Sequence, residues 1–540
     1  MSSLKSGAVA APALWLTRSG WISLAIVLLA LALRVVALDI KPAHFDEGVN
    51  GWFVDQITRD GYYHYDPTNF HGPLHFYVLF VAQTLFGRSE WALRLPLALV
   101  STGCVVLMLA FRRYFGERAC QIAALAMAVS PGFVFYGRYA IHESWLVFFL
   151  LLTIWGLIGL CHEGSRRFLW ATGLGLTGMV LTKETYIIHW IALALGYLTL
   201  RWLERLGWLS SATRFRAAPQ RWDKRDLARV GGVGALLILF FYTGGFLDWP
   251  APRTYGPEGL PNPQGSICGL YETFGAWLFT GVHADTGHGK DWWYWLELLS
   301  QYEWPALLGL LAALAIVRPG VGRHLRWVAI SGGGTLCAYS IIHYKTPWCL
   351  IAMIPPFYFV FGAAVVHLSK RFDRWATGAL AGILLLCSLG RSLALNFRDF
   401  ASELEPYAYV QTVLDINKLL HPLRTIAAAD PRNYHLTGYL VLADQHPLVW
   451  LLGDFTRAHF GLLTDLPEDL SDGKFLVVDE IFVEEIERSL KGSFFREQIT
   501  IRGNSGATHM IYFERETFAA LFPGRVPEFE GPVIPEEDAP

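Results

Sequence analysis

Long apolar stretches with few charges recur through roughly the first 400 residues of the chain. Each is about long enough to cross the ~30 Å hydrocarbon core of a bilayer as one helix, some only with tilt or with support from neighbouring helices. The pattern therefore predicts eleven membrane-spanning helices, at about residues 20–39, 90–111, 119–136, 144–160, 168–182, 185–203, 230–247, 304–317, 325–342, 348–368 and 375–395.

Arginine and lysine in this region gather in alternate loops, namely "FRRYFGER", "HEGSRRF", "RFRAAPQRWDKRDLAR", "RPGVGRHLR" and "SKRFDR". By the positive-inside rule these loops and the N-terminal residues 1–19 face the cytoplasm. The outer side then receives the loops 40–89, 137–143, 183–184, 248–303 and 343–347. Within them, "EGVNGWFVDQIT", "PLHFYVLFVAQTLFG" and "DWWYWLELLSQYEW" are amphipathic, aromatic or too short to span, which favours short helices at the membrane interface.

The pattern changes after about Asn396. "TIAAAD", "PLVWLL", "FLVVDE" and "EQITIRG" read as short strands, whereas "YAYVQTVLDINKLL" and "IFVEEIERSLKG" read as amphipathic helices. We therefore expect a membrane domain at 20–395 with an outer loop at 40–89, a small C-terminal α/β domain at 396–523, and an acidic, proline-rich tail at 524–540. An odd number of spans places the α/β domain on the outer side of the membrane.

Composition agrees with a polytopic membrane protein. The 540 residues are 53% hydrophobic and only 17% charged, with a mean hydropathy of +0.34, whereas soluble proteins carry about 25% charged residues. The net charge of -2 gives no information on nucleic-acid binding, and the sequence contains no basic tract or stacking module for it. The seven cysteines lie singly, without the paired spacing of a zinc site or a disulfide framework.

Ionisable side chains gather in the outer-side loops, each time at the mouth of a helix and beside apolar sequence. Such groups are costly near hydrocarbon unless they are paired or hydrated, which makes them functional candidates. The alternative is that they are ordinary solvated helix ends, but their gathering on one side favours function. The clusters are His44, Asp46 and Glu47; Tyr65, Asp66 and His71; Arg138, His142 and Glu143; Lys183 and Glu184; and His343 and Lys345.

The carboxylates supply the candidate catalytic groups. Asp46 or Glu47 could take a proton from an attacking hydroxyl or accompany a metal ion. His142 and Glu143 could join Asp46 as ligands of a divalent ion, although the sequence does not show that the three converge.

The isolated cations Arg138, Lys183 and Lys345 suit a phosphate or diphosphate whose lipid tail lies in the bilayer. Arg34, inside the first span, either joins them or snorkels to the interface. The sequence contains no P-loop or dinucleotide-binding glycine pattern that would indicate a bound nucleotide. The sequence thus favours transfer of a group from a lipid phosphate on the outer side. The remaining candidates for binding the substrate are His44, Asp66, His71, Glu184 and His343.

The motifs resemble those of the GT-C glycosyltransferases, which include protein O-mannosyltransferases, aminoarabinose transferases and the catalytic subunits of oligosaccharyltransferases. They are most similar to the prokaryotic membrane proteins known as flippase-activity-associated. The resemblance rests on the joint order of "HFDEGVN", "YHYDPTNFHGPLHFY", "FGRSEWALRLP", "GRYAIHESW", "LTKETY" and "YKTPWC", which covers most of residues 20–370.

This resemblance implies a bundle of membrane spans with an outer soluble domain, and a donor that is a polyprenyl-phosphate or polyprenyl-diphosphate sugar. It implies that Asp46 matches the catalytic or metal-binding acid of the first outer loop, with Glu47 as its partner. His142 and Glu143 stand where related enzymes carry a second acidic element. Here that element is His-Glu rather than Asp-x-Asp, which leaves the need for a metal open.

We therefore expect a glycosyltransferase of the hexosyltransferase type in a bacterial inner membrane, moving a sugar from polyprenyl phosphate to a periplasmic protein, lipid or glycan. The first alternative is a non-catalytic partner of a lipid-linked-sugar flippase that binds the same lipid. The second is a proton-coupled transporter, which the clustering of the acids at helix mouths and the lack of an evident internal repeat disfavour.

Overall fold

The computed structural model describes residues 18–66, 69–209, 219–248, 275, 277, 288–315, 321–503 and 506–531. The chain forms two compact units. The first consists of Met1–Ala37, His64–His75 and Arg94–Arg398, and the second of Leu38–Tyr63, Phe76–Leu93 and Asp399–Pro540. The expected boundary near residue 396 follows the change in secondary structure, whereas the compact units place most of the first outer loop with the C-terminal region. The predicted cytoplasmic N-terminus, except its last two residues, and the end of the predicted tail lie outside the described residues.

Helices build the first unit, and each predicted span coincides with one helix or with a broken pair. The main helices at the predicted spans are α1 (Arg18–Val35), α4 (Glu90–Ala110), α6 (Glu117–Val129), α7 (Pro131–Gly137), α8 (Glu143–Glu163), α9 (Arg166–Val180), α10 (Tyr186–Arg205), α11 (Lys224–Tyr242), α14 (Trp304–Ala313), α15 (Arg323–Ile341), α17 (Pro355–Arg371) and α18 (Arg374–Phe397). The other helices are α5 (Arg112–Phe115), α13 (Tyr294–Tyr302), η3 (Pro347–Cys349) and α16 (Leu350–Met353).

Five of these segments are long and apolar enough to cross a membrane: α1, α4 with α5, α8, α10 and α18. The number rises to seven if the bent pairs α6–α7 and η3/α16–α17 each count as one span. The other four predicted spans coincide with helices α9, α11, α14 and α15. Helices α9 and α14 have only 15 and 10 residues. Helices α11 and α15 begin with charged side chains. The protein is thus a multi-pass membrane protein, and the predicted total of eleven spans is not reached by this measure within the described ranges.

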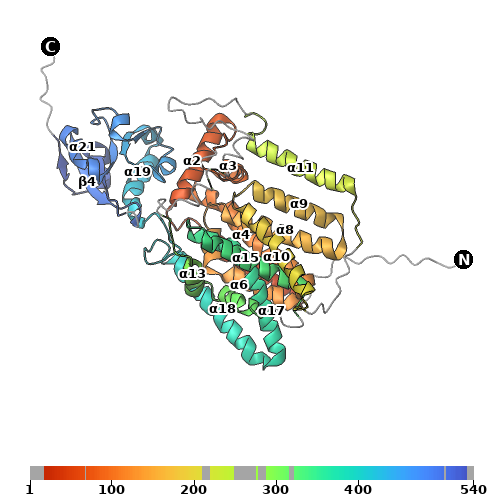
Figure 1. Ribbon diagram of the computed structural model, residues 1–540. Coiled ribbons are helices and arrows are strands. Elements are labelled where there is room, and N and C mark those ends of the chain that lie inside the picture. The colour runs from red at the N-terminus through yellow and green to blue at the C-terminus, as the bar shows by residue number, and fades with distance from the viewer. Residues whose placement is uncertain are drawn as a thin grey trace, which may run out of the picture. The chain divides into compact units, whose positions relative to one another are not determined.

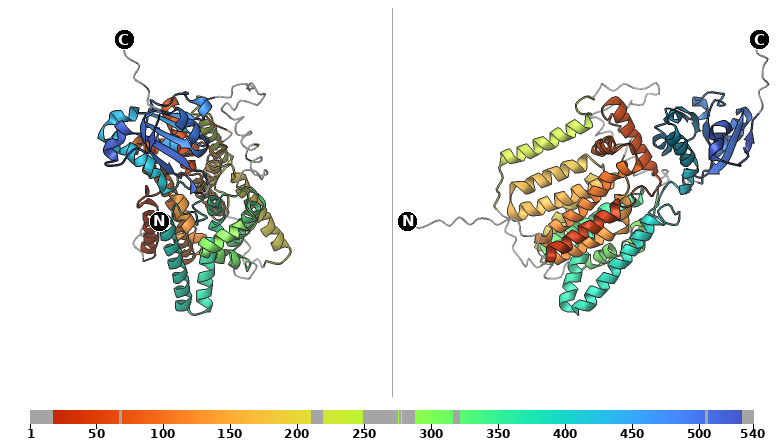
Figure 2. Two further views of the ribbon diagram at one scale, coloured as in Figure 1. Left: turned by 90° about the vertical axis from the view of Figure 1, so that its left-hand side faces the viewer. Right: turned by 180° about the vertical axis from the view of Figure 1, so that it is seen from behind.

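Close packing of α8 against α9 depends on small residues. Figure 1 shows α8, α9 and α11 side by side, and Figure 2 shows the same order from behind. A Cβ atom on Gly156 would lie 2.5 Å from the Thr172 hydroxyl oxygen, and one on Gly175 would lie 2.3 Å from the Thr153 hydroxyl oxygen. Such contacts are typical of helices in membranes, where apolar surface alone does not hold helices together.

A helix break between α6 and α7 is stabilised by a buried arginine. Pro131 begins α7, so the last carbonyls of α6 have no helical partner. Arg34 donates hydrogen bonds to the Met127 and Ala128 carbonyls at 3.2 and 3.1 Å, and to the Ser101 hydroxyl at 2.8 Å. Arg34 is fully buried. It therefore caps α6 rather than snorkelling, and this use also disfavours a contact with a phosphate.

The start of α7 is capped by a buried acid. The Glu303 carboxylate accepts hydrogen bonds from the Gly132 backbone N–H at 2.8 Å, the Ser130 hydroxyl at 2.8 Å and the Tyr358 hydroxyl at 2.7 Å. A carboxylate at a helix N-terminus satisfies free N–H groups and interacts favourably with the helix dipole. Glu303 thus fixes the segment that leads to Arg138, His142 and Glu143.

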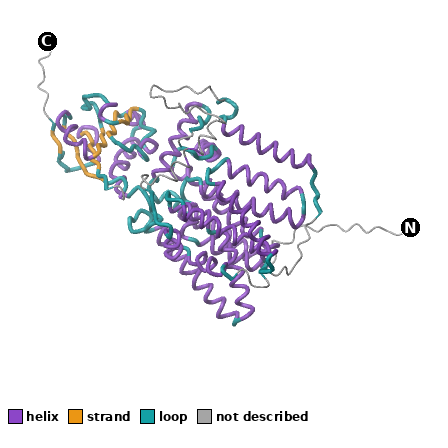
Figure 3. The backbone as a smooth tube through the Cα atoms, viewed as in Figure 1, coloured by secondary structure: helices purple, strands orange, loops and turns teal. Residues whose placement is uncertain are grey.

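The second unit contains α2 (Phe45–Asp60), most of α3 (Leu74–Phe86) and a six-stranded sheet in the order β2-β1-β3-β5-β4-β6. All strands of the described residues lie in the C-terminal region, as Figure 3 shows in orange. Strand β1 pairs in parallel with β2 and β3, and the pairs β3–β5, β5–β4 and β4–β6 are antiparallel. The strands are β1 (Thr437–Val441), β2 (Arg457–Gly461), β3 (Phe475–Asp479), β4 (Ser493–Ile499), β5 (His509–Glu514) and β6 (Phe529–Glu530).

Apolar side chains on one face of this sheet, including Val441, Leu476 and Tyr512, pack with Ile486 and Leu490 into a buried core. The helices of this region are η4 (Leu414–Ile416), α19 (Asn417–Ala429), η5 (Pro431–His435), α20 (Leu448–Leu451), η6 (Leu463–Asp465), η7 (Glu480–Phe482), α21 (Val483–Ser489), α22 (Arg515–Phe518) and η9 (Ala519–Leu521). The predicted α/β character of the C-terminal region is thus confirmed.

Two predicted strands are wrong. "TIAAAD" is the end of helix α19, and "PLVWLL" contains the short helix α20. In α19 the buried residues Leu419, Leu420, Leu423 and Ala427 follow helical spacing, which continues into the segment read as a strand. The predicted helix in "YAYVQTVLDINKLL" begins only at Leu414, because the residues before it run along Arg502, where Thr412 forms an isolated bridge.

Candidate functional site

The motif "HFDEGVN" forms the first turn of α2. His44 is the N-cap, and its Nδ1 accepts a hydrogen bond from the Asp46 backbone N–H at 3.1 Å. The Glu47 carboxylate accepts one from the His44 backbone N–H at 2.9 Å. The two bonds make a capping box, in which each side chain satisfies a backbone donor that has no helical partner. Glu47 is therefore buried and caps the helix, and the catalytic partnership with Asp46 expected from the sequence stays a prediction.

Asp46 differs from its neighbour. Its side chain is 35% exposed, and none of the described residues donates a hydrogen bond to its carboxylate. The closest cationic candidate is His44 Nδ1 at 3.8 Å, which points its lone pair at the Asp46 backbone N–H and so carries no proton. His44 instead donates from Nε2 to the Tyr409 carbonyl at 3.0 Å. The adjacent acids thus divide their roles, with Glu47 shaping the turn and Asp46 left available for chemistry.

Two glycines bring α2 against the C-terminal region. A Cβ atom on Gly48 would lie 2.4 Å from the Cα of Pro447, and one on Gly51 would lie 2.5 Å from ring atoms of Trp450. Such distances are shorter than any van der Waals contact, so only glycine permits this approach. The spacing of three residues puts both glycines on one face of α2. The position of Asp46 is consequently set by residues four hundred positions later in the sequence.

The loop before α20 places further polar and aromatic groups beside the start of α2. The His446 ring lies edge-on to Phe45, with centroids 5.6 Å apart. The Arg502 guanidinium lies 5.0 Å from the centre of the Phe45 ring and forms an ion pair with Asp444. Burial lowers the pKa of His446, against the opposing charges of Asp444 and Asp46. A carboxylate, an imidazole and a guanidinium therefore share one neighbourhood with an aromatic ring.

Several of the predicted residues of the first unit also converge. Glu143, at the start of α8, and Lys183, in the turn between α9 and α10, form a buried ion pair at 2.5 Å. His71 Nδ1 lies 2.9 Å from the Glu184 carboxylate. The His142 ring lies 4.4 Å from the His71 ring, between centroids. We call these residues, together with His75, the histidine–lysine cluster.

The chain around His71 follows the turn that carries Lys183 and Glu184. The Gly72 and Leu74 backbone N–H groups donate to the Thr182 and Leu181 carbonyls at 3.2 and 3.1 Å. A Cβ atom on Gly72 would lie 2.2 Å from the Leu181 backbone. Glycine is therefore required where these two outer-side loops meet.

Burial and ion pairing determine which groups of the histidine–lysine cluster are charged. Burial by itself lowers the pKa of Lys183, but the charges of Glu143 and Glu184 outweigh it and raise this pKa well above its usual value. Burial tends to raise the pKa of Glu184, yet His71 and Lys183 bring it below its usual value. Burial and the nearby Lys183 hold the pKa of His142 well below its usual value. The cluster therefore contains an ammonium, a carboxylate and a neutral imidazole at neutral pH.

The other predicted cations have backbone partners. Arg138 is fully buried and donates to the Leu33 and Arg34 carbonyls at 3.2 and 3.3 Å, and also to those of Val36 and Ala37. It thus caps the end of α1, which disfavours its expected contact with a donor phosphate.

Lys345 is also buried, and its ammonium donates to the Lys290 carbonyl at 3.1 Å and to that of Ile342. Its neighbour His343 is exposed, and its carbonyl accepts a hydrogen bond from the Lys290 backbone N–H. Asp66 is half-buried in the loop before His71. The substrate contacts expected of these residues stay predictions.

The metal site expected at Asp46, His142 and Glu143 stays a prediction. The Glu143 carboxylate is bound by the Lys183 ammonium, which repels a cation. Across the described ranges, no three His, Cys, Asp or Glu side chains are placed to hold a metal ion.

Three residues near the candidate groups were not predicted from the sequence. His75 lies in an apolar segment, yet its ring centroid is 4.0 Å from that of His142. Its position four residues after His71 gave no helical signal, because His71 lies before the start of α3 at Leu74. His446 and Arg502 carried no signal, since they lie in loops of the α/β domain far along the chain from Asp46.

Part of the chain matches a known family. Residues 70–215 match the dolichyl-phosphate-mannose-protein mannosyltransferase family. A stretch of 179 residues is 30% identical to "Putative mannosyltransferase YkcB" of Bacillus subtilis (strain 168), covering 30% of this chain and 25% of that protein. The chain therefore spans about a quarter of the length of this curated relative.

Solved structures with similar architecture cover nearly the whole chain. ArnT from Cupriavidus metallidurans in the apo state has a TM-score of 0.60 at 16% identity, over 95% of this chain and 99% of ArnT. The same protein bound to undecaprenyl phosphate has a TM-score of 0.56 at 16% identity, over 92% and 98%. An oligosaccharyltransferase from Archaeoglobus fulgidus, tethered to an acceptor peptide, has a TM-score of 0.54 at 12% identity, over 89% and 73%.

Proposed function

We propose that this chain, which has the GT-C fold of membrane glycosyltransferases, transfers a sugar from a polyprenyl-phosphate donor to an acceptor hydroxyl. The fold supports the class of enzyme, and the family match over residues 70–215 supports a mannosyltransferase-type reaction. The structure of ArnT with undecaprenyl phosphate supports the choice of donor. The inner membrane and the periplasmic side are the proposed location, following the basic loops.

Asp46 carries the proposal. It lies partly exposed at a helix N-terminus, and its carboxylate accepts no hydrogen bond from the described residues, so it can accept the proton of an incoming hydroxyl. As the acceptor oxygen bonds to the sugar carbon, the bond from that carbon to the phosphate oxygen breaks. The electron pair leaves with the polyprenyl phosphate, and the acceptor proton passes to Asp46.

Lys183 is the proposed ligand of the donor phosphate. Its ammonium makes one hydrogen bond, to Glu143, so two of its three donors have no partner among the described residues. Arg138 and Lys345, in contrast, already bind two or more carbonyl groups. The carboxylates of Glu143 and Glu184 oppose an anion, so we propose that the phosphate takes the place of Glu143 at this ammonium.

Asp46→Asn tests the reaction. The change is nearly isosteric and removes the charge, so we expect turnover to fall by about 10²–10⁴ with little change in donor affinity. Asp60→Asn is the matched control, because Asp60 ends the same helix and its side chain is also 35% exposed. The assay is transfer from radiolabelled polyprenyl-phosphate sugars, with lipid binding measured in parallel. Wild-type transfer by Asp46→Asn would overturn the assignment.

The same experiment separates an enzyme from a non-catalytic partner of a flippase. A partner would bind the donor lipid without turnover, so Asp46→Asn and wild type would differ in nothing but lipid affinity. Release or transfer of sugar by the wild-type protein, lost in Asp46→Asn and kept in Asp60→Asn, is the result that supports the enzyme.

A further inference from the structure

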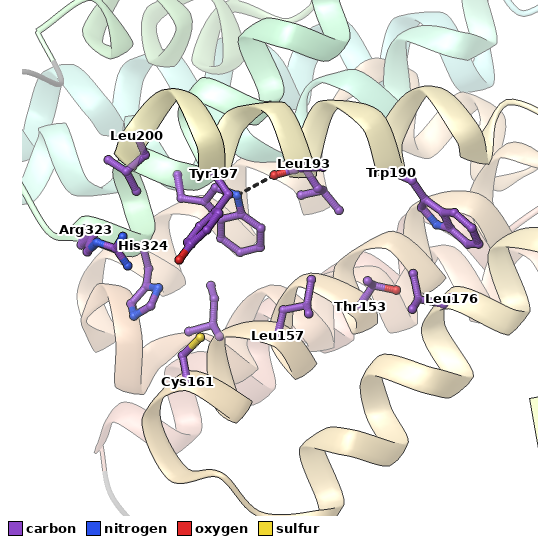
Figure 4. Close-up of a pocket in the computed structure, with 13 residues that line it drawn as sticks. Thr153, Leu157, Cys161, Leu176, Trp190, Leu193, Tyr197, Leu200, Arg323 and His324 are labelled. Carbon is purple, nitrogen blue, oxygen red and sulfur yellow. Dashed lines mark hydrogen bonds between the residues drawn. The ribbon is translucent and has the colours of Figure 1, made fainter. Parts of the chain in front are cut away.

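An apolar groove opens along the membrane-spanning helices of the first unit. It is lined by residues of α8, α9, α10 and α15 and encloses about 470 Å³. Figure 4 shows Trp190, Thr153 and Leu176 at one end, Leu193 and Leu157 along the middle, and Arg323 and His324 at the other end. The Trp327 indole donates a hydrogen bond to the Leu193 carbonyl at 3.0 Å and so fixes the back of the groove.

The surroundings of the groove are those of a bilayer. Helices α8 and α10 are both long and apolar enough to span a membrane. The outer face of α10 beside the groove exposes the large apolar side chains Ile191, Leu195 and Leu198. A groove that opens on such a face fills with hydrocarbon rather than water, because its lining offers water almost no hydrogen-bonding partners.

The groove is about as long as one acyl chain. Trp190 and Leu200 both line it and are ten residues apart on α10, which corresponds to about 15 Å at the rise of an α-helix. This is about half of the ~30 Å hydrocarbon thickness of a bilayer. The groove therefore holds the length of an acyl chain that enters from one side of the membrane.

Charge at the Arg323 end favours an anionic headgroup. The last turns of α10 carry Arg201, Arg205 and the carboxylate of Glu204, and the first turn of α15 carries Arg323. Arg323 is bound by Glu204 in a two-pronged ion pair at 2.6 and 3.2 Å. Helix α15 begins directly after Gly322, which brings no capping side chain, so its first N–H groups add to the positive potential.

We propose that this groove binds one acyl chain of an anionic glycerophospholipid, with the lipid phosphate at the arginine-rich end. Basic pockets between membrane helices on the cytoplasmic side are suited to anionic headgroups, and the positive-inside rule places the loops at this end in the cytoplasm. The end of the groove proposed to bind the phosphate lies at the opposite end of α10 from Lys183, which precedes the first residue of that helix. Binding here does not depend on the proposed glycosyl transfer.

Native mass spectrometry of the full-length protein in detergent tests the site with phosphatidylglycerol and phosphatidylcholine as probes. We expect phosphatidylglycerol to bind at least about tenfold more tightly, which is the worth of one charge-assisted contact. Ala194→Trp fills the groove and should abolish the preference. Leu198→Trp is the matched control, because it lies one turn further along α10, is exposed and does not line the groove.

Two substitutions in the Arg323–Glu204 ion pair should change the affinity for phosphatidylglycerol in opposite directions. Glu204→Gln frees Arg323 for the lipid phosphate and should strengthen phosphatidylglycerol binding, whereas Arg323→Gln should weaken it. A purely structural ion pair would make both variants bind less. Equal binding of the two lipids by wild type, or unchanged binding by Ala194→Trp, would overturn the proposal. Displacement of phosphatidylglycerol by undecaprenyl phosphate would also overturn it, because the groove would then hold the tail of the proposed donor.

Discussion

Gly48→Ala should damage the candidate site without touching any of its chemical groups. The new methyl carbon would lie 2.4 Å from the Cα of Pro447 and 2.7 Å from its Cβ. Carbon atoms in contact lie about 3.5–4.0 Å apart, so α2 and Pro447 must separate by about 1 Å. The contact involves backbone on both sides, and no side-chain rotation can relieve it.

The expected cost has two parts. Overpacking of this kind typically destabilises a protein by about 1–3 kcal/mol. Alanine in place of glycine inside a helix recovers about 0.5–1 kcal/mol. The protein should therefore remain folded at room temperature. Asp46 lies two residues before Gly48, so it moves with the start of α2, and a displacement of about 1 Å can lower a reaction rate by about 10²-fold.

The assay compares sugar transfer under saturating donor with thermal unfolding of the same preparations. We expect turnover of Gly48→Ala to fall by about two orders of magnitude while the unfolding temperature falls only slightly. Gly51→Ala should behave alike, because its methyl would lie 2.5 Å from the Trp450 ring. Gly231→Ala in α11 is the control, since no atom lies within 4 Å of its Cβ position.

Three outcomes have different meanings. Wild-type turnover by Gly48→Ala would show that the contact with Pro447 does not position Asp46, and the reasoning would fail. Equal losses in Gly48→Ala and Gly231→Ala would show a general sensitivity to substitution. A loss confined to Gly48→Ala and Gly51→Ala would show that the α/β domain holds the first outer loop in its working position.

Four further results are expected. Lys183→Met should leave Glu143 as an uncompensated buried charge and lower the free energy of unfolding by about 3–5 kcal/mol. The double variant Lys183→Met with Glu143→Gln should regain most of this stability in thermal unfolding, but its donor binding should stay weak. The Glu184 pKa is lowered in the folded protein, so its stabilising contribution is complete above the ordinary pKa of about 4.5 and is lost as the pH falls through the lower folded value; acid unfolding curves of Glu184→Gln should lack this component. Excess chelator should leave turnover unchanged, and its loss with rescue by a divalent ion would restore the metal hypothesis. A cysteine in place of Asp430 should react with an impermeant thiol reagent in intact spheroplasts, and labelling only after lysis would reverse the proposed orientation.

The sequence by itself determined the helical positions of the membrane part and the identity of the polar candidates. Spans are predictable because a segment in the membrane must satisfy its backbone N–H and C=O groups by its own hydrogen bonds. A long apolar segment therefore has hardly any alternative to a helix. The candidates were identifiable because ionisable residues are rare beside hydrocarbon. These are local properties, and the structure confirms helices at all the predicted positions.

Tertiary structure alone decided which candidates are available for chemistry. Glu47 and Asp46 are adjacent and chemically alike, but in the first turn of α2 Glu47 is part of a capping box, whereas Asp46 stays partly exposed. Arg138 and Arg34 are cations near hydrocarbon, and the ends of α1 and α6 provide carbonyl groups that use them.

The contribution of the α/β domain was likewise beyond the sequence. His446 and Arg502 approach Phe45 only because Gly48 and Gly51 admit Pro447 and Trp450 to the face of α2. Glycine has no side chain, so Gly48 and Gly51 contribute nothing to a hydrophobic or polar sequence pattern. Their partners Pro447 and Trp450 also lie about four hundred residues away in the sequence. The sequence pattern indicates which side chains are suited to a functional site. Whether such a side chain still has hydrogen-bonding groups available for a substrate depends on the partners that it meets in the folded protein.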